Sequence, residues 1–523
     1  MKLKTTILFV IALFVAQFVS AQQWQFVGPR AMGMGGAGVA TAYGPDAQYW
    51  NPAGLASEEE RNEAGLLIGV GATLETTGRV LEAVDDLADM SHRYNDLKSV
   101  INSGGIPSAD NIATIFEGLN DISAFIENDM GVLANGDAGI GFKFKNFAIS
   151  SRAIGTGAVR PVIDKYNIRF YSGSNYLTLD SGTVAPSDPT NLSTAGALAA
   201  AIDANGLLAG LNNLLGTSYA NSTLMANALI NAAASYGIDP NKIASAINTA
   251  IEDMPGAANI INLYGSASGS YKDNETLAMG EVASFGELSL GYGAKVMKGI
   301  KIGGNVKLVS GYTAETGVML LTDNDDFKDI INKAYDNKKN TNTWALDLGA
   351  LVNFAELTGK DIWWNPQVGV TARNINGPKF DRPDMPAGTA AAIATEWNSD
   401  KYQLKPQVRA GVSVNPKNWM TLAADIDVTE NDTLLNGIKS RQLALGMEIN
   451  LVNGSKFNMP LRLGYNKNLA ESSLCPFYTA GIGFNMLHFF VELAGAVSTK
   501  TSKVDGNTVP NSAAASLTIG FLF

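Results

Sequence analysis

Short segments of the chain alternate between apolar side chains and polar or small ones. Residues 461–466 read Leu-Arg-Leu-Gly-Tyr-Asn, and residues 515–523 read Ala-Ser-Leu-Thr-Ile-Gly-Phe-Leu-Phe. A repeat of two residues places one kind of side chain on each face of a β-strand. Many of these segments are about ten residues long, which suits a tilted strand that crosses a lipid bilayer. The pattern therefore predicts an all-β protein built from membrane-length strands.

Fourteen strands are predicted in this way, with edges uncertain by about 2–4 residues. They span residues 64–75, 137–145, 147–159, 282–296, 300–312, 343–354, 365–374, 405–414, 419–428, 440–451, 457–466, 477–485, 487–498 and 514–523. The connections between them alternate between tight turns and long loops. The long ones are 76–136, 160–281, 313–342, 375–404, 429–439, 467–476 and 499–513. Short turns on one side, long loops on the other and an even strand count are typical of bacterial outer-membrane barrels. The sequence thus predicts an antiparallel transmembrane β-barrel of about 14 strands whose two ends lie on the short-turn, periplasmic side.

Two of the long loops, 76–136 and 160–281, are predicted to be helical and extracellular. In the first, apolar residues recur at helical spacing and acidic residues occupy the opposite face, which indicates amphipathic helices. In the second, Leu207, Leu208 and Leu211 begin a leucine stripe, and Asp239-Pro240 is typical of a helix start. Two roles are open for these helices: they pack together as a cap over the barrel mouth, or they contact an apolar ligand directly.

Composition narrows the class further. The chain of 523 residues has 46% hydrophobic but only 17% charged residues, with 54 glycines. After the N-terminus it has no uninterrupted apolar run of about 18 residues, which excludes a helical membrane protein. The formal net charge is −11, and it becomes −13 once Lys2 and Lys4 are removed with the first 21 residues. An acidic protein is a poor match for nucleic acid, whose phosphates require clustered Lys and Arg.

The N-terminal residues 1–21 are predicted to be a cleaved signal peptide. Lys2 and Lys4 precede an almost wholly apolar stretch from Ile7 to Val19, and Ala21 offers a small residue at the cleavage site. Residues 22–62 lack strand alternation and are rich in glycine, so they are expected to fold inside the lumen as a hatch, with 63–523 forming the barrel. Cys475 is the single cysteine, so no intrachain disulfide is possible.

No motif predicts a cofactor, a metal site or a catalytic centre. Gly33, Gly35 and Gly38 match G-x-G-x-x-G, but a dinucleotide site needs a parallel βαβ unit around it. Together with Gly36, these glycines are better explained by a tightly folded segment with positive φ angles. The acidic residues clustered at 323–329 fail the EF-hand spacing. The two histidines, His92 and His488, leave few candidates for a hydrolase, and His488 is expected at the membrane interface.

Aromatic residues gather near the predicted strand ends, which is typical of the girdles at the two membrane surfaces. This set comprises Trp24, Trp50, Trp363, Trp364, Trp419, Tyr292, Tyr312, Tyr465 and Tyr478. The chain finishes on Phe523, preceded at alternate positions by Phe521 and Ile519. These three residues are expected to face lipid on the last strand and to form the signal that the barrel assembly machinery recognises.

The segment after the signal carries a family resemblance. Residues 28–40 read Gly-Pro-Arg-Ala-Met-Gly-Met-Gly-Gly-Ala-Gly-Val-Ala, and Trp50-Asn51-Pro52-Ala53 follow. This stretch resembles the N-terminus of FadL-like outer-membrane channels, most closely the branch of TraF-like conjugal transfer proteins. The resemblance implies a fourteen-stranded barrel, with Asn51, Pro52 and Ala53 in its plug. It covers the motifs of 28–55 only, so the ligand contacts of that family cannot be transferred to this chain.

These observations predict a bacterial outer-membrane protein that passively transports a hydrophobic small molecule. The alternative is a non-transporting structural or assembly barrel whose helical loops bind a partner in secretion, conjugation or surface attachment. An apolar tunnel from the loops to the hatch would favour the channel, whereas a filled barrel would favour the alternative. The expected partners are outer-membrane lipid, the assembly machinery and, for a channel, the apolar ligand.

Overall fold

The structure is a computed structural model of the chain. It describes residues 23–56, 63–78, 80–81, 130–162, 164, 166–167, 185–215, 217–235, 239–241, 275–319, 336–384, 401–435, 437–454, 456–471, 474–504 and 507–523. The expected signal peptide, the helices of loop 76–136, His92 and the acidic cluster at 323–329 lie outside these residues or almost wholly so.

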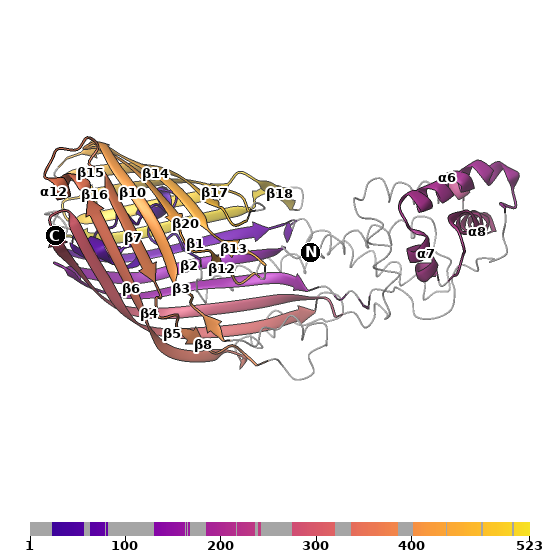
Figure 1. Ribbon diagram of the computed structural model, residues 1–523, viewed down its shortest axis with the longest axis horizontal. Coiled ribbons are helices and arrows are strands. Elements are labelled where there is room, and N and C mark those ends of the chain that lie inside the picture. The colour runs from indigo at the N-terminus through magenta and orange to yellow at the C-terminus, as the bar shows by residue number, and fades with distance from the viewer. Residues whose placement is uncertain are drawn as a thin grey trace.

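Fourteen antiparallel strands form a closed barrel (Figure 1). They are β1 (Ala64–Thr77), β2 (Gly131–Phe144), β3 (Phe147–Val162), β4 (Leu277–Met297), β5 (Ile300–Met319), β6 (Lys339–Asn353), β7 (Gln367–Arg373), β10 (Gln407–Lys417), β11 (Met420–Asp427), β14 (Gln442–Asn453), β15 (Phe457–Asn468), β16 (Phe477–Met486), β17 (Phe489–Ser498) and β20 (Ser512–Leu522). Each strand pairs with the next along the barrel, and β1 pairs with β20 from Gly65↔Leu522 to Glu75↔Ser512 to complete the ring. The predicted fold class is confirmed, since each barrel strand overlaps one of the predicted segments.

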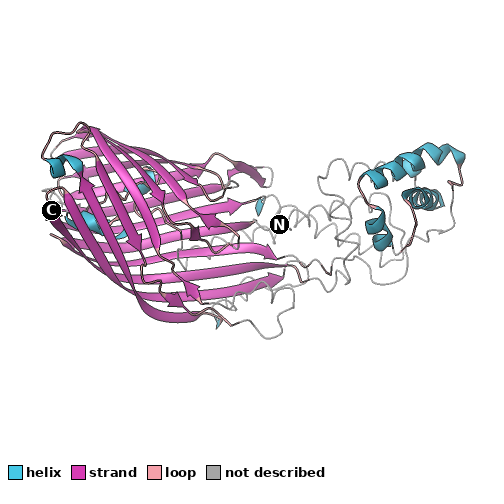
Figure 2. Ribbon diagram, viewed as in Figure 1, coloured by secondary structure: helices cyan, strands magenta, loops and turns pink. Residues whose placement is uncertain are grey.

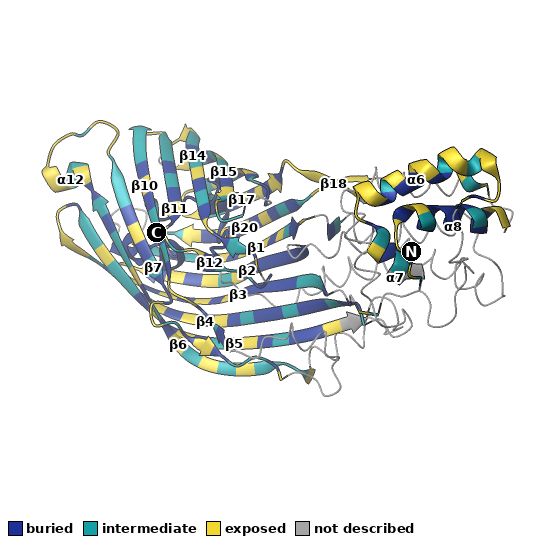
Figure 3. Cartoon of the chain, turned by 45° about the vertical axis from the view of Figure 1, so that its right-hand side comes forward, coloured by how far each residue is buried: buried dark blue, intermediate teal, exposed yellow. Residues whose placement is uncertain are grey.

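The alternation of side chains along the strands follows the two faces of the barrel wall. On β15, Arg462 and Asn466 are buried towards the lumen, whereas Leu463 is exposed on the outside. On β20, Ile519 and Phe521 are exposed and Thr518 is buried. The same alternation of buried and exposed positions is visible along most strands (Figure 3). An apolar outer band with polar residues inside is the arrangement of a transmembrane β-barrel.

The two ends of the barrel differ. Tight turns such as the one between β2 and β3 lie at one end, together with the C-terminus and the short helix α12 (Phe354–Thr358) (Figure 1). At the other end, three small hairpins that the sequence pattern did not predict fold within the long connections. They are β8 (Lys379–Phe380) with β9 (Tyr402–Gln403), β12 (Asn431–Asp432) with β13 (Lys439–Ser440), and β18 (Thr501–Val504) with β19 (Asn507–Pro510).

The connection between β3 and β4 contains helices, as expected for the second long loop. They are α6 (Leu192–Ala204), preceded by the 3₁₀ turn η3 (Pro189–Asn191), then α7 (Leu208–Leu215) and α8 (Ser222–Ser235). Helix α7 covers the predicted leucine stripe from Leu208 onwards. The helix expected to start at Asp239-Pro240 lies almost wholly outside the described residues. Leu198, Ile202, Met225 and Ile230 are fully buried in a core that the three helices share. The helices lie beyond the long-connection end of the barrel and apart from its strands (Figure 2). They pack together, as one of the two roles expects, but around their own core. The described residues contain no helix that is both long and apolar enough to cross a membrane.

Candidate functional site

Residues 23–56 lie inside the barrel and are almost entirely buried. We call this segment the hatch. It contains α2 (Pro29–Gly33), α3 (Ala47–Trp50) and the 3₁₀ helix η1 (Pro52–Ala56). Pro29 occupies the first helical position of α2, where a missing N–H is tolerated. The burial of this segment within the lumen matches the expected plug.

Asn51 joins the hatch to the barrel wall. Its side-chain Nδ2 donates to the carbonyl oxygens of Val39 at 3.1 Å and Ala350 on β6 at 3.0 Å, and its Oδ1 accepts from the Ala53 amide at 3.1 Å. Every polar group of this fully buried amide is therefore used. Pro52 follows at the start of η1, and its carbonyl oxygen lies directly over Gly303 of β5. The Asn-Pro-Ala motif thus fixes one corner of the hatch against two neighbouring strands.

Glycines on the inner face of the wall allow the hatch backbone to approach the strands. A Cβ on Gly446 of β14 would lie 2.5 Å from the Cβ of Met34, and a Cβ on Gly481 of β16 would lie 3.2 Å from the Cα of Gly33. We call the set the glycine track, and its members lie on consecutive wall strands except β11. They are Gly291, Gly293, Gly303, Gly349, Gly369, Gly411, Gly446, Gly464 and Gly481. Side chains at these positions would push the hatch off the wall.

Glycine is also required at several positions of the hatch itself, because of backbone conformation or close packing. Gly35 and Gly36 have φ angles of 69° and 94°, which L-residues with side chains rarely adopt. A Cβ on Gly35 would also lie 2.5 Å from the Tyr465 carbonyl oxygen. Gly38 packs against the indole ring of Trp50, and Gly33 against β16. The structure therefore places the G-x-G-x-x-G residues in close backbone packing against antiparallel strands, without the parallel pairing that a dinucleotide site needs.

A buried ion-pair network attaches α2 to one side of the wall. Arg30 of the hatch donates to Glu448 of β14 at 3.1 and 3.3 Å. Glu448 also accepts from Arg462 of β15 at 2.7 Å, and Arg462 donates to Glu492 of β17 at 2.7 Å. We call these four residues the clamp. Arg462 is 1% exposed and each carboxylate 10%, so the loss of a partner would leave an uncompensated buried charge.

Further charged residues of the lumen bind other parts of the hatch. Arg152 of β3 pairs with Asp46 of the hatch at 2.9 Å and with Asp137 of β2 at 3.0 Å. Burial raises the pKa of the Asp46 carboxyl, and Arg152 acts in the opposite direction. On the opposite wall, one Asp425 oxygen accepts from the backbone amides of Gly38 and Val39, both at 2.8 Å. The hatch is therefore held by charged contacts on several sides.

An aromatic cluster forms the centre of the hatch. The Trp24 ring packs edge-on against Tyr49, with centroids 5.9 Å apart, and stacks on Trp50 at 6.1 Å. The guanidinium of Arg373 lies 4.0 Å from the Tyr49 centroid, and that of Arg409 lies 4.9 Å from the Trp24 centroid. Cations over aromatic faces attract the ring quadrupole. Trp24 and Trp50 thus lie in the lumen, so their assignment to the membrane girdle was wrong.

Towards the long connections the lumen contains an apolar cluster, with the charged residues Glu281, Glu315 and Arg382 further along the wall. Strand residues such as Phe285, Val309 and Ala345 face inwards and contact residues contributed by the connections. The connection residues are Phe380, Tyr402, Leu404, Leu434, Leu435, Ile438 and Leu474. We call this buried cluster the apolar chamber. The Phe285 ring lies 4.5 Å from Phe380 and 5.7 Å from Tyr402 between centroids, so the chamber is filled by the protein itself.

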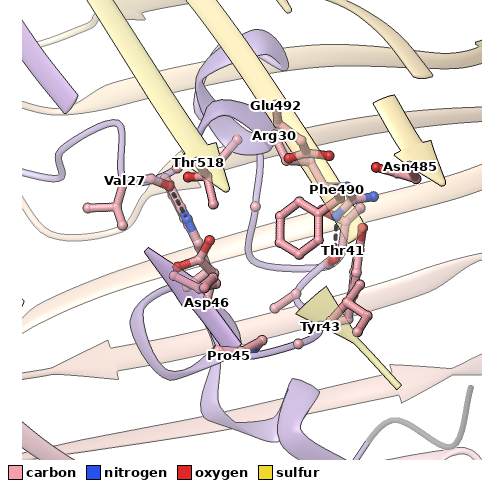
Figure 4. A pocket seen from close by; sticks show the side chains of 18 of the residues that line it. Val27, Arg30, Thr41, Tyr43, Pro45, Asp46, Asn485, Phe490, Glu492 and Thr518 are labelled. Atoms are coloured by element: carbon pink, nitrogen blue, oxygen red, sulfur yellow. Dashed lines mark hydrogen bonds between the residues drawn. The ribbon is translucent and has the colours of Figure 1, made fainter. Parts of the chain in front are cut away.

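Among the described residues, two cavities larger than about 20 Å³ adjoin the hatch on its other sides. One, of about 80 Å³, lies between the hatch and the strands β17, β20 and β1 (Figure 4). Arg30, Tyr43 and Asp46 line it from the hatch, opposite Glu492 and Thr518. Burial raises the pKa of the Tyr43 hydroxyl to about 12, against the opposing effect of Arg30. The other, of about 840 Å³, lies at the short-turn end and is mostly polar in lining. Neither cavity is the apolar tunnel that the sequence-based channel hypothesis anticipates.

The sequence-based candidates are brought together only in part. Asn51, Pro52, Ala53 and the hatch glycines lie against the inner wall, whereas Ile519 and Phe521 are exposed on the outer face of β20 and Phe523 follows the end of that strand. Phe523 stacks on the His488 ring at 5.0 Å between centroids, and His488 is exposed there. No group of residues suited to bind a metal ion occurs in the described part of the chain.

Sequence reasoning missed the buried charged residues of the lumen, which bind the hatch or one another. Each lies at an inward position of a predicted strand. The set is Asp137, Arg152, Glu287, Lys307, Asp347, Arg373, Arg409, Asp425, Asp427, Glu448, Arg462 and Glu492. A charge inside a membrane-length strand points to the lumen, and that signal could have identified them.

Fold and site together define a transmembrane β-barrel of the outer-membrane type whose lumen is closed by its own N-terminal hatch. Residues 48–427 match the family described as F plasmid transfer operon, TraF, protein, so the chain belongs to that family. This confirms the predicted resemblance to the TraF-like branch. No curated protein matches the chain.

Three solved structures illustrate the similarity to known barrels. The toluene transporter TodX of Pseudomonas putida is 8% identical, with a TM-score of 0.37 and coverage of 97% of this chain and 98% of that chain. The CymD monoaromatic hydrocarbon channel is 11% identical, with a TM-score of 0.38 and coverage of 95% and 96%. A Pseudomonas aeruginosa FadL homologue is 9% identical, with a TM-score of 0.38 and coverage of 96% and 99%.

Proposed function

We propose that the protein is an outer-membrane channel for small apolar molecules and that the structure represents its closed state. The observation that carries this proposal is the apolar chamber. Barrels that conduct water have polar interiors. Inward-facing Phe285, Val309 and Ala345 would therefore be unfavourable in a water-filled pore, and they suit a site that receives an apolar guest.

The wall of the apolar chamber consists of barrel strands, whereas the side chains that occupy it come from the long connections and could be displaced. Its walls are barrel strands, which are held by continuous ladders such as β4 with β5. Its filling comes from connections that include the two-residue hairpin pairs β8–β9 and β12–β13. An apolar molecule that displaces Phe380 or Leu435 would keep the wall residues out of water. The free energy of binding then depends on how much better the ligand packs against the wall than the loop side chains that it replaces.

Binding of an environment-sensitive apolar dye to the purified protein tests this proposal. Phe380→Ala removes a filling side chain, and truncation of a buried Phe costs about 3–5 kcal/mol in lost packing. We expect the variant to bind the dye at least tenfold more tightly than the unaltered protein. Phe354→Ala, in α12 at the opposite end, is the matched control and should not change the affinity. Equal affinities for all three proteins would contradict the proposal.

A second function is supported by the separate helical module α6–α8, which lies beyond the barrel and has its own core. Such a module suits binding of a partner, and the family description refers to a plasmid transfer operon. The filled lumen also agrees with a non-transporting barrel. Excision of residues 168–274 distinguishes the two functions. If the protein is a channel, the excised variant should still bind the dye. If it is a partner-binding barrel, excision should abolish cross-linking to the partner, and neither protein should bind the dye.

We further propose that the long connections face the outside of the cell and that the short turns face the periplasm, as in other outer-membrane barrels. Protease added to intact cells should cut within 163–276 and release a fragment that carries α6–α8. Cleavage at the turn around Asn418 from the outside would contradict this orientation.

Assembly machinery and outer-membrane lipid are the proposed partners of the exposed C-terminal residues. Phe521 and Phe523 face outwards on the closing strand, where both contact the surroundings of the barrel. Deletion of Phe523 should reduce the amount of folded barrel in the membrane, measured by its heat-modifiable mobility on gels. Unchanged yield would show that the terminal residue is not part of the signal.

A further inference from the structure

The 840 Å³ cavity at the short-turn end has a lining dominated by side-chain amides. Eight asparagines and one glutamine line it, at the ends of strands from β6 round to β16. They are Asn353, Asn365, Asn415, Asn418, Asn450, Asn453, Asn458, Asn485 and Gln367. We call this cavity the amide vestibule. Its volume is in the upper part of the range of about 300–1,000 Å³ typical of ligand sites.

The amides of the vestibule are only partly used by one another. Asn458 donates to Asn450 at 3.1 Å and accepts from Asn485 at 3.2 Å. The Oδ1 atom of Asn485 is buried without a hydrogen-bond partner, and so is the Nη1 atom of Arg462. Arg462 is 1% exposed, so this donor is a deeply buried group at the floor of the vestibule. Both atoms are also closed to solvent, so the groups that a ligand can reach are the more exposed amides of the lining, such as those of Asn418 and Asn453.

The charges around the vestibule favour an anion. Lys301, Lys417, Arg30 and Arg462 line it, against the carboxylates of Glu356 and Glu448. The clamp balances Arg30 and Arg462 with two carboxylates, so the remaining cations of the lining are Lys301 and Lys417. A charged N–H donor binds a carboxylate oxygen more strongly than it binds a neutral acceptor.

The same lining argues against a carbohydrate or an apolar guest. Tyr43 is the one aromatic residue among those that line the cavity, and its ring is already covered by the Arg30 guanidinium at 4.6 Å from the centroid. No free aromatic face is left there for a sugar ring or an apolar ligand. Amide side chains offer a donor and an acceptor side by side, and a peptide group presents the complementary pair.

We propose that the amide vestibule binds an extended peptide that ends in a free carboxylate. The carboxylate lies towards the lysines of the lining, Lys301 and Lys417, and the peptide groups that precede it hydrogen-bond to the asparagines at the strand ends. The segment enters from the side that the short turns face. This site is separate from the apolar chamber, which lies on the other side of the hatch, so the proposal does not depend on the channel function.

Binding of acetyl-tetraalanine to the full-length protein in detergent tests the proposal by calorimetry. We expect saturable binding that weakens at least tenfold when the C-terminal carboxylate of the peptide is amidated. Acetate at the same ionic strength should not compete, because it lacks the peptide groups. If acetate competes fully, the site accepts any small anion and the peptide proposal is wrong. No saturable binding of acetyl-tetraalanine, or equal binding of the amidated form, would also overturn it.

A pair of matched variants locates the binding. Asn415→Asp keeps the acceptor that receives the Thr421 hydroxyl at 2.8 Å and adds a negative charge inside the vestibule. It should weaken peptide binding at least tenfold. Asn146→Asp adds the same charge in the β2–β3 turn, away from the vestibule, and should leave binding unchanged. Equal effects of the two variants would assign the binding to net charge and not to this cavity.

Discussion

At the scale of single residues, small side chains decide where the hatch can lie. The glycine track leaves the inner wall without side chains where the hatch backbone crosses it. Sequence alternation predicted that these positions face inwards, but it could not separate a glycine needed for a turn from one needed for contact. That distinction depends on which backbone segment lies opposite, which local pattern does not encode.

Gly464→Ala tests the track. The added Cβ would collide with the backbone nitrogen of Gly35, and overpacking of this kind costs about 1–3 kcal/mol. The hatch should loosen, and single-channel conductance in planar bilayers should rise. Gly157→Ala is the matched control, because the nearest atom to its Cβ is a Val282 methyl at 3.9 Å. Similar conductance for both variants would show that close backbone packing does not hold the hatch.

Residues on the outer face of the barrel contact lipid, so a charge there costs free energy. Ile519→Arg places a cation on the lipid face of β20, which costs about 2–4 kcal/mol near the bilayer midplane. The yield of folded barrel should fall strongly, as measured by heat-modifiable mobility. Asn146→Arg, in a short turn, should have little effect because the cost near the interface is about 0–1 kcal/mol. An equal yield for the two variants would place Ile519 away from the lipid.

At the scale of elements, the sequence predicted the wall better than the connections. The predicted starts of β2 and β4 were several residues late, at 137 and 282, whereas the strands begin at Gly131 and Leu277. In these stretches the alternation fades; on β4 the outward positions are small or only partly exposed. The hairpins β8–β9 and β12–β13 contain two residues per strand, which is too short for a period of two to be recognised.

The ion pairs of the clamp connect α2 to the strands β14, β15 and β17. Glu448→Gln leaves Arg30 and Arg462 without the carboxylate that they share, and breaking a buried pair costs about 3–5 kcal/mol. We expect the hatch to become sensitive to proteolysis in the purified protein. Asp384→Asn removes the exposed partner of Lys339, and such pairs contribute about 0–1 kcal/mol, so this control should leave the hatch resistant. A protected hatch in Glu448→Gln would mean that packing alone retains it.

At the scale of the whole molecule, the barrel and the hatch have different sources of stability. The strands satisfy their backbone hydrogen bonds with one another in a closed ring. The hatch contributes buried aromatic area and charged contacts but no strand to that ring. The architecture was predictable because strand period and connection length are both visible along the chain. The filled chamber was not, because it results from loops meeting across the lumen.

Deletion of residues 22–62 tests this division. The barrel should still assemble, because its ladders do not include the hatch. Without the hatch the lumen should conduct, and the current in planar bilayers should rise well above that of the intact protein. An assembled but non-conducting deletion variant would show that the connections that fill the chamber close the lumen by themselves.

The long strands on one side of the barrel set the distance between the helical module and the membrane. At about 3.3 Å per residue and a tilt of about 40°, the 21 residues of β4 rise roughly 50 Å, about twice the ~25 Å apolar belt. In the proposed orientation, the chain therefore leaves the barrel towards α6–α8 well above the outer surface of the bilayer. This height should keep the module accessible to a large molecule in solution whatever the length of the surface polysaccharide. Antibody against α6–α8 should therefore label cells with truncated and with full-length surface polysaccharide to a similar extent.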